Sequence, residues 1–251
     1  MKSPSLKSPA LPPSPRLPEP ARSARRPAGF TLVELAVVLL ILALLAGPLT
    51  AGLSARIARQ AEQRTDEALA EARDSLLGHL VRHNRLPCPA KSPTDGAEAY
   101  DGSTCAQYNG LLPWATLGIR GENGWARRLR YVVTPAYTKP LTGIEDGKLE
   151  VFTRNLDGAE LSLTTTTGQS PAVILSHGAN GLGATHADGS PQPPPIAGSD
   201  EARNATANST RFYSRTLSEN PGAPGGAFDD RVTWLSPNLV AYHLSSAGKL
   251  P

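Results

Sequence analysis

Cysteine is scarce in this chain of 251 residues, and its scarcity limits the chemistry that the chain can perform. There are only two cysteines, Cys88 and Cys105. They form neither a Cys-x-x-Cys redox motif nor part of a zinc-ligand array. Dithiol redox catalysis and cysteine-based zinc sites are therefore excluded.

The usual signatures of hydrolases and nucleotide-binding proteins are also missing. His79 and His83 stand at helical spacing, but the glutamate of a His-Glu-x-x-His zinc site is absent between them, so a solvated helix face is favoured. No Gly-x-Ser-x-Gly elbow surrounds Ser176. The glycine-rich run 178–183 lacks the full dinucleotide spacing and the P-loop lysine. No catalytic residue is predicted, and the protein is not expected to be an enzyme.

Charge is nearly absent from a long apolar run that begins at Phe30 and reaches Leu53. Its 24 residues contain one charged side chain, Glu34. A helix of that length is long enough to cross a hydrocarbon core of about 30 Å. Because an ionised group at the middle of such a helix costs roughly 2.5–3.5 kcal/mol on insertion scales, a lone acid is a candidate functional residue. Glu34 needs a positively charged partner.

A cut of the chain between Gly29 and Phe30 would supply that partner. The new α-amine of Phe30 would be positive at neutral pH and would lie one helical turn from Glu34. Glu34 would then sit in the first turn of the helix, where the helix dipole favours negative charge. In an assembly, the carboxylate can instead meet the amine of a neighbouring chain. Either pairing removes an uncompensated charge from lipid.

The sequence Gly-Phe-Thr-Leu-Val-Glu at residues 29–34, followed by an aliphatic run, resembles the prepilin leader junction of type IV pilins and type II secretion pseudopilins. The resemblance implies cleavage after Gly29 by a prepilin peptidase, N-methylation of Phe30, and a role for Glu34 in packing subunits into a filament. It covers residues 29 to about 53 and the remainder only in outline. The alternative is an ordinary signal anchor with one tolerated acid, but the fixed offsets of the four residue types favour the pilin interpretation.

The resemblance and the composition together divide the chain into four segments. These are a basic leader that is removed (1–29), a transmembrane and filament-core helix (30–53), an amphipathic helix (54–84) and a globular pilin-like domain (85–251). The leader carries six basic residues and one acid. Its net positive charge is therefore larger than the net charge of +3 of the whole chain. Basic residues before an apolar span hold the N-terminus in the cytoplasm, so the domain is expected in the periplasm. Because the basic excess belongs to the leader, no nucleic-acid partner is expected.

The pattern after Leu53 predicts an α+β fold. Apolar residues recur at three- and four-residue steps, which indicates an amphipathic helix that ends before Pro87. Short β-branched or aromatic segments, separated by turns, then predict three to five antiparallel strands. Their ranges are 129–134, 149–153, 161–165, 172–175 and 231–235. Glycine, serine, asparagine and proline dominate residues 178–228, which predicts a long irregular loop. The expected fold is pilin-like, with a long N-terminal helix packed on a small antiparallel sheet with long irregular loops.

A disulfide between Cys88 and Cys105 is expected if the domain is periplasmic, because that compartment is oxidising. Closing a loop of this size stabilises the fold by about 3 kcal/mol in the chain-entropy model. A pair of free thiols is the alternative.

Calcium is the one cofactor for which the sequence offers candidates. Some type II secretion major pseudopilins hold calcium in a loop near the last strands, and this chain has Asp229 and Asp230 in that region. Further acids of the same neighbourhood are Asp188, Asp200 and Glu201. Calcium takes six to eight oxygen ligands, and no spacing here matches a known loop. Solvated loop acids are therefore the favoured alternative, with no cofactor bound.

These observations predict a structural subunit, a minor pilin or pseudopilin of a type IV pilus or a type II secretion pseudopilus. It would cross the inner membrane once, with its N-terminus in the cytoplasm, and then enter the pilus or pseudopilus. The implied partners are the prepilin peptidase and methylase and other pilin or pseudopilin subunits. One alternative is a periplasmic enzyme or binding module on an uncleaved signal anchor. Another is a pilus-borne adhesin, which differs only in what residues 178–228 bind.

Overall fold

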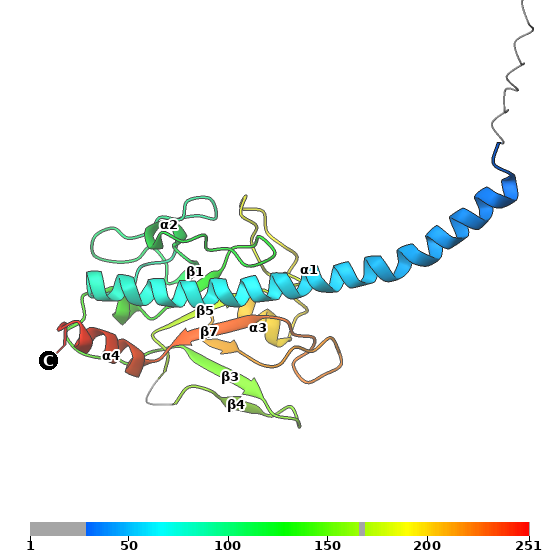
Figure 1. Cartoon of the computed structure of the whole chain (residues 1–251). Coiled ribbons are helices and arrows are strands. Elements are labelled where there is room, and N and C mark those ends of the chain that lie inside the picture. Colours follow the sequence, from blue (N-terminus) through cyan, green and yellow to red (C-terminus); the bar gives the residue numbers. More distant parts are fainter. Residues whose placement is uncertain (1–28, 166–168, 251) are drawn as a thin grey trace, which may run out of the picture. The chain divides into compact units, whose positions relative to one another are not determined.

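The computed structural model describes residues 29–165 and 169–250, and the side chains of residues 45–53 lie outside that description. The predicted leader, apart from Gly29, also lies outside the described residues. Contacts divide the chain into two compact units, residues 1–49 and 50–251. The first helix, α1 (Leu32–His83), contributes residues to both units (Figure 1).

In the first unit, all the side chains that the structure describes are exposed. Phe30 is 79% exposed and Leu32 is 86% exposed. A continuous apolar surface of this kind is uncommon on a monomeric protein and marks an interaction site. Among the described residues, no helix has both the length and the hydropathy needed to span a membrane. Part of the predicted span, residues 45–53, lies outside the described side chains.

In the second unit, α1 is amphipathic. The buried side chains recur three and four residues apart, at Ala61, Thr65, Leu69, Ala72, Leu76 and Leu80. This spacing places them along one stripe of the helix, which packs on the globular domain. The helix ends at His83, and Asn84 takes a positive φ of 55°, a conformation that asparagine tolerates better than most residues.

The globular unit contains two β-sheets. The first is antiparallel with the order β1-β2-β5-β7, formed by β1 (Asn109–Leu111), β2 (Arg130–Val133), β5 (Ala172–Ser176) and β7 (Arg231–Leu235). The second has the order β4-β3-β6, formed by β3 (Glu150–Arg154), β4 (Glu160–Ser162) and β6 (Arg211–Tyr213). In it, β3 pairs antiparallel with β4 and parallel with β6. The predicted α+β class is confirmed, with a second sheet that the sequence pattern did not predict.

Strand β5 is buried on both faces, and all five of its residues are inaccessible to solvent. On one face, Ala172 and Ile174 share a core with Leu76 of α1. On the other face, Val173 and Leu175 share a core with Phe212 of the second sheet. Figure 1 shows the corresponding layers, with α1 and the second sheet on opposite sides of the first sheet. Burial on both faces explains why this segment is continuously apolar.

The helices α3 (Asp200–Ala205) and α4 (Pro237–Ser246) were not predicted from the sequence. Each begins at a serine cap, because the Oγ of Ser199 accepts a hydrogen bond from Ala202 and that of Ser236 from Leu239. With α3 and β6 inside it, the segment 178–228 contains regular structure that the prediction of an irregular loop missed. The remaining elements are α2 (Trp114–Leu117) and the 3₁₀ turn η1 (Pro135–Thr138).

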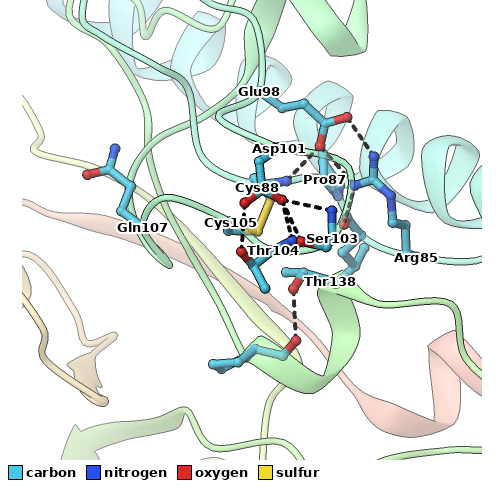
Figure 2. Close-up of a disulfide and its surroundings, with 12 residues drawn as sticks. Arg85, Pro87, Cys88, Glu98, Asp101, Ser103, Thr104, Cys105, Gln107 and Thr138 are labelled. Atoms are coloured by element: carbon cyan, nitrogen blue, oxygen red, sulfur yellow. Dashed lines mark hydrogen bonds and ion pairs between the residues drawn. A yellow bond between two sulfur atoms is a disulfide. The ribbon is translucent and has the colours of Figure 1, made fainter.

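Cys88 and Cys105 form the predicted disulfide, with their Cα atoms 5.4 Å apart (Figure 2). Glu98 lies within the closed loop and accepts a hydrogen bond from the Cys88 amide at 3.0 Å. The same carboxylate binds the guanidinium of Arg85 through two hydrogen bonds of 2.8 and 2.9 Å. The covalent bond and the ion pair together hold the irregular segment after α1 in place.

The loop that carries Gly124 approaches α1 so closely that only glycine fits there. A Cβ at position 124 would lie 2.0 Å from the backbone oxygen of Ala61. Thr65 joins the two segments, because its Oγ1 accepts a hydrogen bond from the Gly124 amide at 3.0 Å and donates one to the Ala61 oxygen at 2.8 Å. A small residue and a bridging hydroxyl thus set the distance between loop and helix.

Gly124→Ala should lower the free energy of unfolding by about 1–3 kcal/mol, because the added methyl group forces the loop away from α1. Gly78 provides the matched control, since a Cβ at that helical position meets nothing within 4 Å. Gly78→Ala should raise the free energy of unfolding by about 0.5–1 kcal/mol. Chemical denaturation of both variants tests the pair, and equal effects of the two substitutions would contradict the close contact.

Candidate functional site

The predicted cleavage point lies just outside the start of α1. Gly29, Phe30 and Thr31 are exposed and non-helical. Thr31 caps the helix, because its Oγ1 accepts a hydrogen bond from the Glu34 amide at 3.2 Å and its backbone oxygen accepts one from Leu35 at 3.1 Å. The peptide bond between residues 29 and 30 therefore lies in accessible backbone, the kind of segment that proteases cut.

Glu34 lies in the first turn of α1, where the helix dipole stabilises a negative charge. The Thr-x-x-Glu spacing from Thr31 to Glu34 is that of a capping box, a local signal of a helix start that the sequence analysis did not use. Gly29 has free space around it, since an added Cβ would meet nothing within 4 Å. Among the described residues, nothing in the chain's own packing requires glycine at position 29.

The second candidate site is a cluster of three carboxylates in the globular unit. The loop before β7 carries Asp229 and Asp230, and α3 contributes Glu201. One carboxylate oxygen from each of the three lies within 4.8 Å of the others. The structure thus adds Glu201 to the two aspartates that the sequence singled out, although 28 residues separate Glu201 from Asp229.

Two residues of the cluster are buried and Asp229 is half-buried, and two of the carboxylate oxygens have no hydrogen-bond partner among the described residues. Glu201 and Asp230 are 3% and 4% exposed. The Oδ1 atoms of Asp229 and Asp230 have no donor among the described residues. Burial is the largest cause that raises the pKa of Glu201 to about 7, and the nearby charges of Asp230 and Asp229 contribute to this rise. Burial also raises the pKa of Asp229. The expectation that these acids are solvated loop residues was therefore wrong.

Two asparagines and a histidine surround the cluster. Asn180 donates from its side chain to both oxygens of Glu201, at 3.1 and 3.2 Å, and from its backbone to Asp229 Oδ2 at 2.7 Å. Asn204 donates to Asp230 Oδ2 at 2.8 Å. His177 places Nδ1 3.4 Å from Asp230 Oδ1. These contacts fix the carboxylates while leaving the two Oδ1 atoms available for a cation.

The other acids of the predicted neighbourhood do not join this cluster. Asp188 is exposed and accepts hydrogen bonds from the backbone and side chain of Ser190 in a turn. Asp200 is fully buried, but both of its oxygens bind arginines, at 2.7 Å to Arg154 and 2.9 Å to Arg215. Its charge is already balanced, so it fastens α3 to the neighbouring strands.

Of the histidine pair on α1, His83 is exposed, as the sequence had suggested, but His79 does not lie on a solvated helix face. His79 is 1% exposed, and neither ring nitrogen has a hydrogen-bond partner among the described residues. Its ring stacks on that of His83, with centroids 4.2 Å apart. Burial is the largest cause that lowers the pKa of His79 to about 4, and the electrostatic effect of the neighbouring His83 contributes to this shift. His79 is thus a neutral side chain at the edge of the core.

Comparison with known proteins gives a match to a family model in the N-terminal part of the chain. The family model of the prokaryotic N-terminal methylation motif matches residues 24–50. No curated protein and no solved structure matches the chain. The matched region includes Gly29, Phe30 and Glu34, together with the capped start of α1. The chain carries the N-terminal methylation motif that is the hallmark of prepilin-type proteins, the type IV pilins and pseudopilins.

Proposed function

We propose that the protein is a structural subunit of a type IV pilus or a type II secretion pseudopilus. Prepilin peptidase cleaves it after Gly29, and the new N-terminus at Phe30 is methylated. The observation that carries this proposal is the methylation motif at residues 24–50, together with an exposed Gly29–Phe30 bond directly before the cap of α1. The absence of catalytic sequence motifs supports a structural role rather than an enzymatic one.

Cleavage explains the acid in the apolar segment. A free α-amine at Phe30 carries a positive charge beside the start of α1, where the helix dipole disfavours it. Glu34 neutralises this charge within its own chain or in a neighbouring subunit. The exposed apolar residues from Phe30 to Leu44 then occupy the inner membrane and afterwards the core of the filament. The globular unit stays in the periplasm and becomes the surface of a minor or accessory subunit.

Gly29→Val should block or strongly slow maturation. A side chain at position 29 meets nothing in the described structure, so the defect would arise at the peptidase and not in the fold. Gel mobility and mass spectrometry of the N-terminus, in a host with the peptidase, measure the result. We expect methylated Phe30 in the unmodified protein and in a Gly78→Ala control, and an intact leader in the variant. An intact Met1 in the unmodified protein would contradict the proposal.

Glu34→Val should leave membrane insertion unchanged and reduce filament incorporation by about tenfold or more, because the N-terminal amine loses a charge partner worth more than about 1.4 kcal/mol. Glu71→Val, at an exposed acid of the same helix, is the matched control. Shearing of filaments followed by immunoblotting measures incorporation. Equal incorporation of both variants would remove charge pairing from the mechanism.

We further propose that Glu201, Asp229 and Asp230 hold a divalent cation of the calcium class. Two buried carboxylates and a half-buried one so close together cannot all ionise without a compensating positive charge. Their ligand atoms are oxygens, which calcium prefers, and the two unpartnered Oδ1 atoms are ready acceptors. This second function is favoured by the geometry of the cluster and does not depend on the processing of the N-terminus.

Calcium should stabilise the protein at pH 8 and have little effect at pH 5. Glu201 has a folded pKa raised to about 7, so its protonation stabilises the fold below about pH 4.5, and this stability is lost as the pH rises through 7. At a hundredfold excess over its Kd, a bound cation restores about 2.7 kcal/mol. Thermal unfolding of the full chain in detergent, with calcium or with a chelator, measures the shift.

Two variants separate this site from general charge effects. Asp230→Asn removes a buried ligand and should abolish the calcium-dependent shift, whereas Asp188→Asn changes an exposed acid and should retain it. A calcium shift of the same size in both variants, or no shift in the unmodified protein, would show that the cluster shares protons and binds no cation.

A further inference from the structure

A cavity of about 390 Å³ opens on the globular unit beside β1 and β2. Its lining includes three charged basic side chains, Lys91, Arg128 and Arg130, of which Arg128 is paired with Glu122 at 3.0 Å. Within the part of the chain that the structure describes, no aspartate or glutamate lines it. The volume falls in the range of sites for small ligands. Size and charge together indicate a small, negatively charged ligand.

One hydrogen-bond donor in this lining has no partner. The Nδ2 atom of Asn109 is buried and unbonded among the described residues. The orientation of this amide is set by Arg130, whose Nε and Nη2 both donate to Asn109 Oδ1, at 3.1 and 2.7 Å. Because an arginine can only donate, the other end of the amide must be the NH₂ group. Asn109, a residue of the cavity lining, therefore carries a fixed donor that needs an acceptor.

Arg130 carries a positive charge that no hydrogen-bonded carboxylate balances. Its hydrogen bonds go to three neutral oxygens, those of the Asn109 side chain and of the Asn204 and Thr206 backbone. Burial lowers its pKa to about 10, and Asp230 acts on it only through longer-range attraction. The guanidinium remains charged at neutral pH and adds to the positive potential of the cavity.

His177 is a second buried polar group of the lining without a hydrogen bond. Its side chain is 2% exposed, and both ring nitrogens are unpartnered among the described residues. It directly follows the last residue of β5, and Asp230 lies on one side of its ring, 3.4 Å from Nδ1. Nδ1 is thus within ion-pair distance of Asp230, and Nε2 is the ring nitrogen for which a bound ligand would provide a partner.

We propose that this cavity binds a small organic acid through its carboxylate, with Asn109 as a fixed donor and the surrounding basic side chains as counter-charge. A cavity of about 390 Å³ has room for a single small molecule or a terminal acidic group. Gly183, Thr185 and Ala207 form part of the wall, which gives a binding role to the segment 178–228. This function is additional to filament assembly and does not depend on it.

The test is calorimetric titration of the full chain in nonionic detergent at low ionic strength. Glucuronate is the probe, glucose is the neutral control of similar size, and sulfate is the inorganic anion. We expect glucuronate to bind with a Kd of about 1 mM or tighter and glucose to give no heat. No glucuronate heat at about 10 mM, or sulfate binding as tightly as glucuronate, would overturn the proposal.

Matched variants locate the binding site. Lys91 and Lys139 are both exposed, but only Lys91 lines the cavity. Lys91→Glu should weaken glucuronate binding by about tenfold or more, and Lys139→Glu should leave it within about twofold. Asn109→Asp keeps the acceptor for Arg130 and replaces the free donor with a charged oxygen, so it should abolish binding. Equal weakening by the two lysine variants would overturn the assignment to this cavity, even if the Asn109 variant fails to fold.

Discussion

The burial of β5 on both faces is the constraint on which the globular unit depends. The strand has no solvated side, so α1 must cover one face of the first sheet and the second sheet must cover the other. The same arrangement determines where the polar groups lie. Ser176 at the end of β5 pairs with Arg231 at the start of β7, which brings the Asp229 and Asp230 loop beside His177. Both candidate binding regions of the unit therefore lie at this end of the sheet.

The two regions share a boundary but differ in charge. His177 lines the basic cavity, and its ring also lies next to Asp230 of the carboxylate cluster. Asn204 connects them as well, because its side chain binds Asp230 and its backbone oxygen accepts from Arg130. A negative and a positive site are thus held close together through His177 and Asn204, and each moderates the electrostatic potential at the other.

A feature of the fold or of the candidate sites could be predicted when its sequence signal lies within a short segment of the chain. The junction at Gly29 and Phe30, the α+β class and the disulfide follow from short motifs, from periodicity and from two cysteines in a chain with no others. Helix α4 also had a local signal, the Ser-Pro pair at residues 236–237, but that signal was overlooked. The pattern predicted strands at β3 and β4, but their separate sheet had little local signal, because β6 is three residues long and pairs with β3 across more than 50 residues.

The side-chain clusters were harder to predict, because they form only when distant segments meet. Asp229 and Asp230 stand out as neighbours, but Glu201 and Asn180 join them through tertiary contacts alone. For His79, the sequence analysis predicted an exposed side chain, whereas the structure buries it. Polar residues at helical spacing usually face solvent, yet this imidazole lies on the same buried stripe as Leu76 and Leu80. The helical period shows which residues share a face of the helix. Whether that face is buried depends on how much of the helix the surrounding domain covers.

The position of the cap at Thr31 has a consequence for maturation. Since α1 begins at Leu32, removal of everything up to Gly29 breaks no intrahelical hydrogen bond. Precursor and mature subunit would enter the same helix at the same residue, and no refolding would separate them. Maturation would then change the charge at the start of α1 without changing the backbone of the helix. A tail with several charged residues would be replaced by one ammonium group.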